Sequence, residues 1–399
     1  MRGFILICSL LVTACATPDV RSAVVPGEAR VAFSGKGIGA TKARGLADRA
    51  TGRRVTIDDP VRLASISKLI VGIGVMRLVE AGTLDLDADV SDRLGWRLRN
   101  PAFPDVPITL RLLLSHRSSL RDGIDYALPL DARLRDELAK PEAWDTGHAP
   151  GAWFHYTNLN LPVVAAVMEA ATGERFDRLM RRLVFDPLAL DACYNWPTCS
   201  DGQVARAVVL YDAAGNAVRD DNHGTRPDCP IVPARDGKCD LDRWQKGANG
   251  ATFSPQGGAR VSMRDLAKIG RLLMDDGTVD GVRLLTPASV AAMRAPLWRY
   301  DGANGDSEGG FYCAYGLAVQ LLNIVPGCDD DLFGDGRPHF GHAGEAYSLR
   351  SGLWIDPAAG KGVAFFTTSV PDPAPRGKSA YTQAEERMAR GLVPGEYRP

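Results

Sequence analysis

Residues 62–90 read RLASISKLIVGIGVMRLVEAGTLDLDADV, a stretch in which apolar side chains recur at close to a helical period. Gly82 stands where a helix commonly ends, which predicts a helix over residues 65–80 with a serine as its N-cap. Because leucine, isoleucine and valine occupy nearly every face, we expect this helix to be buried almost all round. Ser65 and Lys68 stand three residues apart at its start, so their side chains are expected on one face.

The Ser65–Lys68 pair has the chemistry of an activated nucleophile. A serine hydroxyl is a weak nucleophile until a neighbouring base takes its proton. Lysine can be that base only where burial or a cationic neighbour lowers its pKa from about 10.4. Burial at the start of an apolar helix supplies that condition. The spacing alone occurs by chance in many proteins, so a capping serine beside a solvated lysine is the alternative interpretation.

Further segments in chain order favour the nucleophile. They are ITLRLLLSHRSSL (108–120), PGAWFHYTNLN (150–160), GGARVSMRDLAKIGRLLMDDG (257–277), LLTPASVAAM (284–293) and FGHAGEAYSLRSGLWIDPAAG (340–360). With residues 62–90 they resemble the β-lactamase/penicillin-binding-protein superfamily of serine hydrolases, in particular its class C β-lactamase-like branch. That branch includes family VIII carboxylesterases and D-aminopeptidase or DD-peptidase-like proteins. The family's three elements are Ser-x-x-Lys, a Ser-Asp-Asn equivalent (here Tyr-x-Asn) and Lys-Thr-Gly.

The resemblance implies a role for each matching residue. Ser65 would form the acyl-enzyme, with Lys68 as its proton partner. Tyr156 would relay a proton between nucleophile and leaving group, its pKa lowered by Lys68. Asn158 would hold the Lys68 ammonium and the ester or amide region of the substrate. A capped turn before the next helix is the structural alternative for Tyr156 and Asn158, and both roles can hold at once.

The third motif departs from the family pattern, because His342-Ala343-Gly344 replaces Lys-Thr-Gly. Gly344 retains the glycine that lets a strand approach substrate closely, next to an oxyanion site shared with the Ser65 N–H. His342, with an ordinary pKa near 6.5, would be only partly charged and would bind a substrate carboxylate less firmly than lysine. This favours an esterase or amidase. Arg350 is either a compensating carboxylate partner or a surface charge of the strand.

Strand-like runs near both ends of the chain enclose a mainly helical middle. We expect an α/β (α+β) chain with a class C β-lactamase-like fold, in which both termini build an antiparallel sheet flanked by helices around an α-rich subdomain. The expected strand runs are 30–62, 311–322, 347–355 and 362–369, and the expected helices are 65–80, 109–116, 159–172, 175–183, 263–274 and 383–392. The chain is expected to divide into a lipoprotein-type signal (1–15), a polar leader (16–29) and one hydrolase domain (30–395). Within that domain we expect a sheet region at 30–64 and 255–395, an α-rich region at 65–190 and a disulfide-pinned insertion at 191–250.

The N-terminus and the cysteines indicate export. Arg2, a short apolar run over residues 4–12 and small residues before Cys15 resemble a lipoprotein signal, which implies lipidation of Cys15 and a periplasmic, outer-membrane-anchored protein. An ordinary cleavable signal is the alternative. The six remaining cysteines suggest disulfides between neighbours, because each pair closes a short loop: Cys193–Cys199, Cys229–Cys239 and Cys313–Cys328. A zinc site is the competing interpretation, although no C-x-x-C pair is present.

Composition excludes one class of partner. The 399 residues carry a net charge of −1 with no basic run, so nucleic acid is not expected to bind. The expected partner is a small ester, amide or peptidoglycan-derived molecule, with no cofactor and no membrane contact beyond a lipid on Cys15. The alternatives are a DD-peptidase or β-lactamase, a non-catalytic envelope-binding lipoprotein on the same fold, and a zinc-dependent hydrolase.

Overall fold

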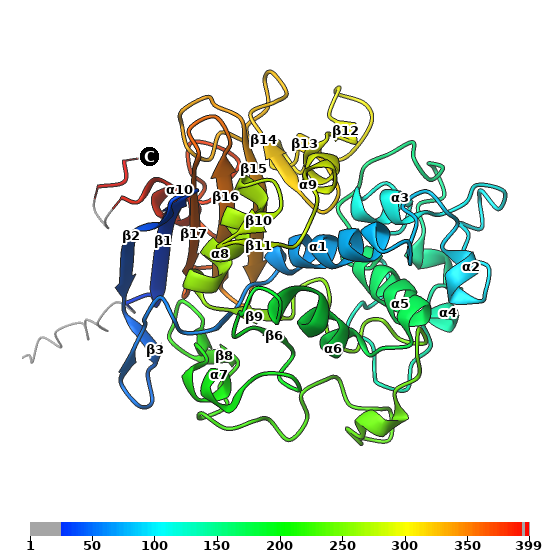
Figure 1. The fold of residues 1–399 in the computed structure, drawn as a ribbon, viewed down its shortest axis with the longest axis horizontal. Coiled ribbons are helices and arrows are strands. Elements are labelled where there is room, and N and C mark those ends of the chain that lie inside the picture. The colour runs from blue at the N-terminus through cyan, green and yellow to red at the C-terminus, as the bar shows by residue number, and fades with distance from the viewer. Residues whose placement is uncertain (1–24, 393–395, 399) are drawn as a thin grey trace, which may run out of the picture.

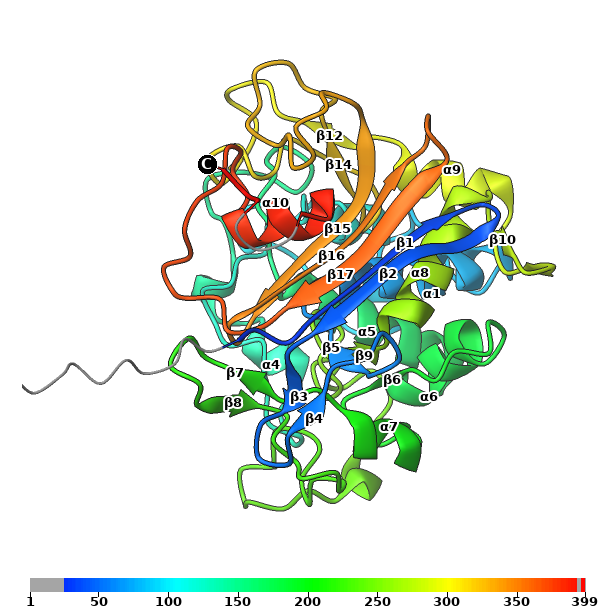
Figure 2. The same ribbon diagram turned by 90° about the vertical axis from the view of Figure 1, so that its left-hand side faces the viewer.

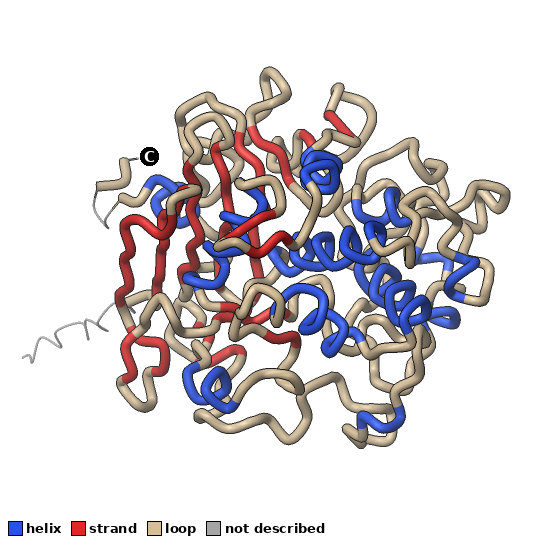
Figure 3. The backbone as a smooth tube through the Cα atoms, viewed as in Figure 1, coloured by secondary structure: helices blue, strands red, loops and turns tan. Residues whose placement is uncertain are grey.

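A computed structural model describes residues 25–392 and 396–398 (Figure 1). Strands gather on one side of the molecule and most helices on the other (Figure 3). Cys15, the predicted signal and most of the predicted leader lie outside the described residues. Within the described part of the chain, no helix is both long and apolar enough to cross a bilayer.

Strands from both ends of the chain meet in one antiparallel sheet. Its eight described strands run in the order β12-β13-β14-β15-β16-β17-β1-β2. Their bounds are β1 Glu28–Ser34, β2 Gly37–Arg44, β12 Trp298–Arg299, β13 Ala314–Tyr315, β14 Gln320–Leu322, β15 His339–Ala346, β16 Leu349–Asp356 and β17 Lys361–Thr367. The first strand pairs with the last, from Glu28 opposite Thr367 to Ser34 opposite Lys361. The predicted fold class is therefore confirmed, although β1 begins inside the stretch that was predicted to be leader.

Helices pack on both faces of the large sheet, because successive side chains of each strand point to opposite faces. Those described are α1 Ile66–Glu80, α2 Ser91–Leu94, α3 Leu110–Leu114, α4 Leu134–Glu137, α5 Asn160–Thr172, α6 Phe176–Met180, α7 Asp201–Arg206, α8 Met263–Met274, α9 Pro287–Arg294 and α10 Gln383–Arg390. Short turns of other helix types cover Pro141–Ala143, Arg181–Phe185 and Leu241–Arg243. Phe365 packs with Met388 of α10, whereas the neighbouring Phe366 belongs to the main core. Successive side chains of a strand point to opposite faces, so α10 covers one face and α8 the other (Figure 2).

Helix α1 is the buried axis of the molecule. Twelve of its residues are buried, from Ile66 to Leu78, which confirms the expectation from its apolar faces. Its first turn lies beside a three-stranded sheet of β5 (Val61–Arg62), β9 (Ala259–Val261) and β6 (Cys193–Tyr194). The other small sheets are β3 (Leu46–Asp48) with β4 (Arg53–Arg54), β7 (Leu210–Tyr211) with β8 (Ala217–Arg219), and β10 (Thr278–Val279) with β11 (Val282–Arg283).

Two predicted strands have different bounds in the structure. The run 311–322 divides into β13 and β14, because the chain turns between them with Ala318 at a φ of 55°. Tyr347, predicted to begin a strand, lies in the turn between β15 and β16, where it and Ser348 both have positive φ. Positive φ at both turn positions suits a tight hairpin. The strand that precedes this hairpin, β15, was not among the expected strand runs, although Gly344 was expected to lie on a strand.

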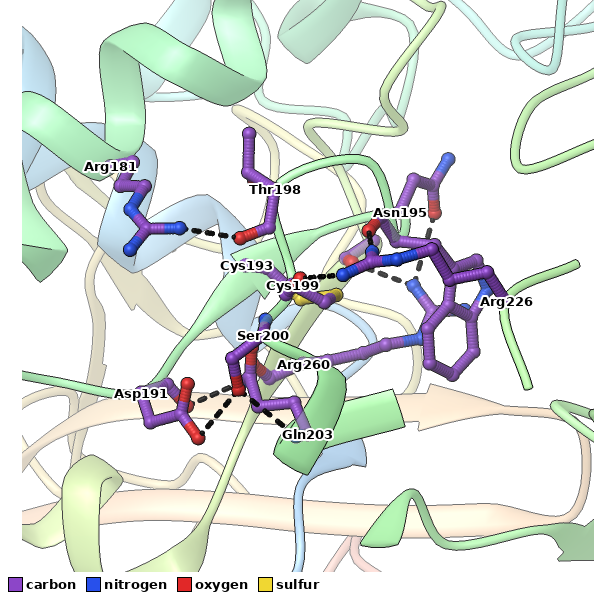
Figure 4. Close-up of a disulfide and its surroundings, with 12 residues drawn as sticks. Arg181, Asp191, Cys193, Asn195, Thr198, Cys199, Ser200, Gln203, Arg226 and Arg260 are labelled. Atoms are coloured by element: carbon purple, nitrogen blue, oxygen red, sulfur yellow. Dashed lines mark hydrogen bonds between the residues drawn. A yellow bond between two sulfur atoms is a disulfide. The ribbon is translucent and has the colours of Figure 1, made fainter. Parts of the chain in front are cut away.

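The predicted disulfide pairing is present, with bonds Cys193–Cys199, Cys229–Cys239 and Cys313–Cys328. Around the first of them, the side chains of Asn195, Arg226 and Arg260 converge (Figure 4). Arg226 donates to the backbone oxygens of Trp196 and Cys199, and Arg260 lies 3.9 Å from the centre of the Trp196 ring. The loop closed by this disulfide therefore packs firmly against β9, next to the start of α1.

Candidate active site

Ser65 occupies the N-cap position of α1, where the preceding residue is conformationally unusual. Ala64 has a φ of 49°, a region that residues other than glycine seldom adopt. The Tyr194 hydroxyl donates to the Ser67 carbonyl at 3.0 Å, and the Ala259 N–H donates to the Ser67 hydroxyl at 3.1 Å. These bonds hold the first helical turn against β6 and β9. Within that turn the Ser67 and Lys68 N–H groups donate to the Ala64 and Ser65 carbonyls, each at 3.0 Å, so the expected oxyanion donor is the N–H of Ser65 itself.

Lys68 contacts the nucleophile directly and is fully buried. Its Nζ donates to Ser65 Oγ at 2.9 Å, to Asn158 Oδ1 at 2.8 Å and to the Gln256 carbonyl at 3.2 Å. Burial lowers the pKa of Lys68 to about 7, although the Asp122 carboxylate acts in the opposite direction. A lysine with this pKa is neutral in a large fraction of molecules near neutral pH, so it can accept the serine proton.

Tyr156 lies between two aromatic rings above Lys68. Its ring stacks on His116 with centroids 4.4 Å apart and on Tyr312 at 4.6 Å, and Lys68 Nζ lies 4.8 Å from its centre. The Tyr156 hydroxyl is buried and makes no hydrogen bond within the described residues. The Ser65 and Tyr312 hydroxyls nevertheless lie close enough to affect its pKa. Burial raises that pKa, so the predicted lowering by Lys68 is wrong. A neutral tyrosine is suited to donating a proton, not to accepting one at rest.

Asn158 is positioned by a residue that sequence reasoning missed. Asp122 accepts from the Asn158 N–H, the Asn158 side-chain amide and the Leu159 N–H, each at 2.9 Å. Because the amide nitrogen is bonded to Asp122, the amide oxygen faces Lys68. Asp122 lies in a loop with no motif of its own, and no signal in the sequence identifies it.

Gly344 lets strand β15 approach the nucleophile. A Cβ at this position would lie 2.3 Å from both the Leu63 carbonyl oxygen and Ser351 Oγ, so any side chain would collide with backbone. Ser351 also donates to the Leu63 carbonyl at 2.9 Å, which ties β16 to the residues just before Ser65. The glycine of the third motif is therefore required by the contact between strand and nucleophile.

His342 is not the partly charged residue that the sequence suggested. It is 1% exposed, and burial together with the charge of Lys68 lowers its pKa to about 3. Its Nδ1 lies 2.5 Å from the Ala343 carbonyl oxygen, so Nδ1 carries the proton and Nε2 accepts from the Tyr315 hydroxyl at 2.7 Å. His342 is thus neutral and does not line the pocket, and the expectation that it binds a carboxylate is wrong.

Arg350 is already paired. Its guanidinium contacts Glu345 at 2.6 Å across the β15–β16 hairpin, and its side chain is only 9% exposed. The expectation that Arg350 is either a free carboxylate partner or a surface charge is therefore corrected: it is a mostly buried cation held by Glu345.

The pocket in front of Ser65 has a volume of about 580 Å³. Its wall combines the predicted Ser65, Tyr156, Asn158 and Gly344 with residues that the sequence did not indicate, among them Arg62, Tyr126, Gln256, Glu308, Tyr312, Glu345, Tyr347 and Glu385. The structure thus brings together the nucleophile, Lys68, Tyr156, Asn158 and Gly344, and leaves His342 and Arg350 behind the wall.

Metal ligation finds no support at this site. The six described cysteines form disulfides, so none is free to bind zinc. Away from the pocket, His339 lies near the carboxylates of Asp335 and Asp356. Arg337 contacts both carboxylates at 2.9 Å, which already supplies the positive charge between them.

Comparison with known proteins agrees with this geometry. The profile of the Beta-lactamase family matches residues 12–387. Penicillin-binding protein 4 of Amycolatopsis lactamdurans is 28% identical over 311 residues, which cover 71% of this chain and 74% of that protein. Esterase EstB of Burkholderia gladioli is 36% identical over 171 residues, but these cover only 38% of this chain and 42% of the esterase.

The fold has a solved counterpart in a class C β-lactamase from Rhodobacter sphaeroides, with a TM-score of 0.64 and 19% identity over 92% of this chain and 93% of that one. The family match spans nearly the whole chain, and the candidate residues Ser65 and Tyr156 line one pocket with Lys68 buried behind them. The chain belongs to the Beta-lactamase family and is a serine hydrolase of that fold.

Proposed function

We propose that this protein hydrolyses carboxylic esters or small amides through an acyl-enzyme on Ser65. The observation that carries the proposal is the 2.9 Å hydrogen bond between Ser65 Oγ and Lys68 Nζ, made by a lysine that burial holds at a pKa of about 7. A base at this distance and with this pKa is matched to taking the serine proton near neutral pH.

Acylation follows from the placement of these groups. Neutral Lys68 takes the proton of Ser65 as Oγ bonds to the substrate carbonyl carbon, and the resulting oxyanion lies toward the Ser65 N–H and the backbone beside Gly344. As the bond to the leaving group breaks, the Tyr156 hydroxyl gives its proton to that group and recovers one from Lys68. Water then attacks the acyl carbon, with the same groups moving its proton, and Ser65 is released.

The substrate class is proposed from what the third motif lacks. A lysine in that motif would offer a permanent charge to the carboxylate of a β-lactam or a D-Ala terminus, whereas His342 is neutral and buried. The similarity to Esterase EstB supports esters. The longer match to Penicillin-binding protein 4 supports the second candidate, a DD-peptidase or β-lactamase, for which we expect much weaker activity.

A labelling experiment tests the mechanism. A fluorophosphonate probe should label the wild-type protein and fail to label Ser65→Ala, which should also lose hydrolysis of p-nitrophenyl esters. Ser67→Ala is the matched control, because its hydroxyl bonds to Ala259 and not to the pocket, and it should still be labelled. Labelling of folded Ser65→Ala would contradict the proposal, and a wild type that is folded but unlabelled would indicate a binding protein on this fold. Nitrocefin and D-Ala-D-Ala peptides in the same screen test the second candidate.

We also propose that the protein is exported and anchored by a lipid on Cys15. Three disulfides support an oxidising compartment. Mass spectrometry of the mature N-terminus tests the anchor: a diacylglyceryl group on Cys15 is expected, and a mature chain that begins at another residue would contradict it.

A further inference from the structure

The wall of the pocket carries more negative than positive charge. Glu308, Glu345 and Glu385 line it, and Arg62 is the only arginine or lysine among the lining residues in the described chain. Arg62 is 5% exposed, donates to Asn195 and lies 5.5 Å from the centre of the Tyr347 ring. Its charge is therefore directed into the protein more than toward a substrate.

Glu308 is the acidic group without a partner. Within the described residues it forms no ion pair, and its charged neighbours Asp306, Glu345 and Asp122 are all acidic. Glu308 is exposed in the pocket, and partial desolvation there together with these acidic neighbours raises its pKa to about 7. By contrast, Glu345 is paired with Arg350, and Glu385 caps α10 through Thr382. Glu308 thus presents a carboxylate that nothing in the described chain neutralises.

A second, independent feature of the pocket is a hydrogen-bond acceptor that has no donor. Gln256 lines the pocket, is 7% exposed, and its side-chain oxygen has no hydrogen-bond partner. A buried acceptor left unpaired destabilises the protein, and a ligand that donates a hydrogen bond to it would remove that cost. Gln256 also accepts from Lys68 through its backbone carbonyl, so the backbone of this residue lies next to Lys68.

We infer that the pocket selects esters or amides that carry an ammonium group, with Glu308 as its ion-pair partner and the Gln256 side-chain oxygen as a hydrogen-bond acceptor. Anionic substrates are disfavoured twice, by the unpaired Glu308 and by Glu345, whose exposed carboxylate lines the pocket while it neutralises Arg350 behind the wall. The inference rests on the proposed hydrolysis at Ser65 and adds the charge of the substrate.

Matched substrates test the charge preference on either side of the scissile bond. On the acyl side, the p-nitrophenyl ester of ε-aminocaproate is compared with that of heptanoate, its neutral isostere, and with the anionic pimelate monoester. On the leaving-group side, butyrylthiocholine is compared with its neutral tert-butyl isostere. Assays are run above the pKa of Glu308. In at least one pair, kcat/KM for the cationic substrate should exceed that for the neutral one by about fivefold to tenfold, the scale of a partly solvated ion pair.

Variants then assign the preference to the acidic groups. Glu308→Gln should bring the cationic-to-neutral ratio close to one, and Glu345→Gln should raise the rate on the pimelate ester relative to heptanoate, because it removes a negative charge from the pocket wall. Asp105→Asn is the matched control, because its side chain is 97% exposed on a distant loop, and the ratios should not change. Ratios are insensitive to a general loss of folded protein.

Two results would overturn the inference. Hydrolysis of the neutral esters with no cationic preference in either pair, or a preference that survives Glu308→Gln, leaves Ser65 chemistry intact and removes the role of Glu308. Absence of hydrolysis for every ester, with no labelling of Ser65, overturns the proposed function and the inference with it.

Discussion

The two walls of the pocket differ in how deeply their charged groups are buried and in how these groups are paired. One wall, which we call the nucleophile wall, comprises Ser65, Tyr156 and Asn158 with the buried Lys68 behind them. Lys68 donates hydrogen bonds to Ser65 at 2.9 Å and to Asn158 at 2.8 Å. The opposite wall comprises the exposed end of β15 and the loop that carries Glu308. There Glu345 is 69% exposed and Glu308 has no counter-charge.

From this difference we expect the nucleophile wall to carry out the reaction and the opposite wall to select the substrate. A lysine can act as a base only where water is excluded, so the nucleophile wall must be packed in the core. A charged rim can change without disturbing that core, because partly solvated ion pairs contribute little to stability. The first wall should therefore respond to substitution in kcat, and the second in the ratio between substrates.

The largest effect is expected at Lys68. Lys68→Met should lower kcat/KM by roughly a thousandfold, because the serine then lacks its base. In the wild type, activity should rise as the pH passes upward through about 7, since Lys68 is a base only in its neutral form. The variant should lack this rise. Lys361→Met, at an exposed position where β17 begins, is the control. An unchanged pH profile in Lys68→Met would assign the base elsewhere.

The second effect is expected at Tyr156. Tyr156→Phe should reduce kcat roughly a hundredfold for substrates with poor leaving groups, which need the proton most. The loss should be smaller for p-nitrophenyl esters, whose leaving group departs without protonation. Steady-state kinetics on an alkyl ester and a p-nitrophenyl ester of the same acid measures this contrast, with Tyr300→Phe as control. Equal losses on both substrates would show that Tyr156 acts by packing alone.

Gly344 lies where the two walls meet, and its substitution should affect both. Gly344→Ala should cost about 1–3 kcal/mol of unfolding free energy, because the new methyl group collides with the Leu63 carbonyl. Ser65 labelling should slow as β15 moves away from the nucleophile. Gly35→Ala is the matched control, since a Cβ there meets nothing within 4 Å. Labelling at the wild-type rate would show that this contact does not position Ser65.

The smallest effect on catalysis is expected from the disulfide behind the nucleophile wall. Replacing Cys193 and Cys199 by serine should lower stability by about 2 kcal/mol, as expected for a short loop. It should also lower kcat slightly, because Asn195 in that loop bonds both Arg62 and Arg260. The same change at Cys229 and Cys239, whose loop has no such link, should lower the melting temperature only. Equal kcat in the two double variants would show that the first loop does not support the pocket.

Much of the candidate active site could be predicted from the sequence. The ordered motifs identified Ser65, Lys68, Tyr156, Asn158 and Gly344, because their chemical types and local helix or turn signals are encoded within a few neighbouring residues. The neighbour pairing of cysteines was also readable, since short loops bring the sulfurs together. Asp122, Tyr312 and Glu308 were not, because each reaches the site from a loop through contacts that are remote in sequence.

The direction of the pKa shift was predicted correctly for one of these residues and wrongly for two. For Lys68 the direction followed from an apolar helix that had to be buried. For His342 the expectation used the ordinary pKa of histidine, and for Tyr156 it considered the charge of Lys68. Both expectations were wrong, because neither included burial by the packing of β15 and of the aromatic stack.

A local pattern was sufficient to predict the fold class and the family, and to single out Ser65 as the candidate nucleophile, since periodicity and motif order are properties of the chain itself. Tertiary structure alone decided which charges face the substrate: Arg350 is held by Glu345 and Glu308 is left unpaired only once the β15–β16 hairpin and the loop at residue 308 are folded together. Burial and pairing are properties of three-dimensional neighbours, and they determine whether a charge is available.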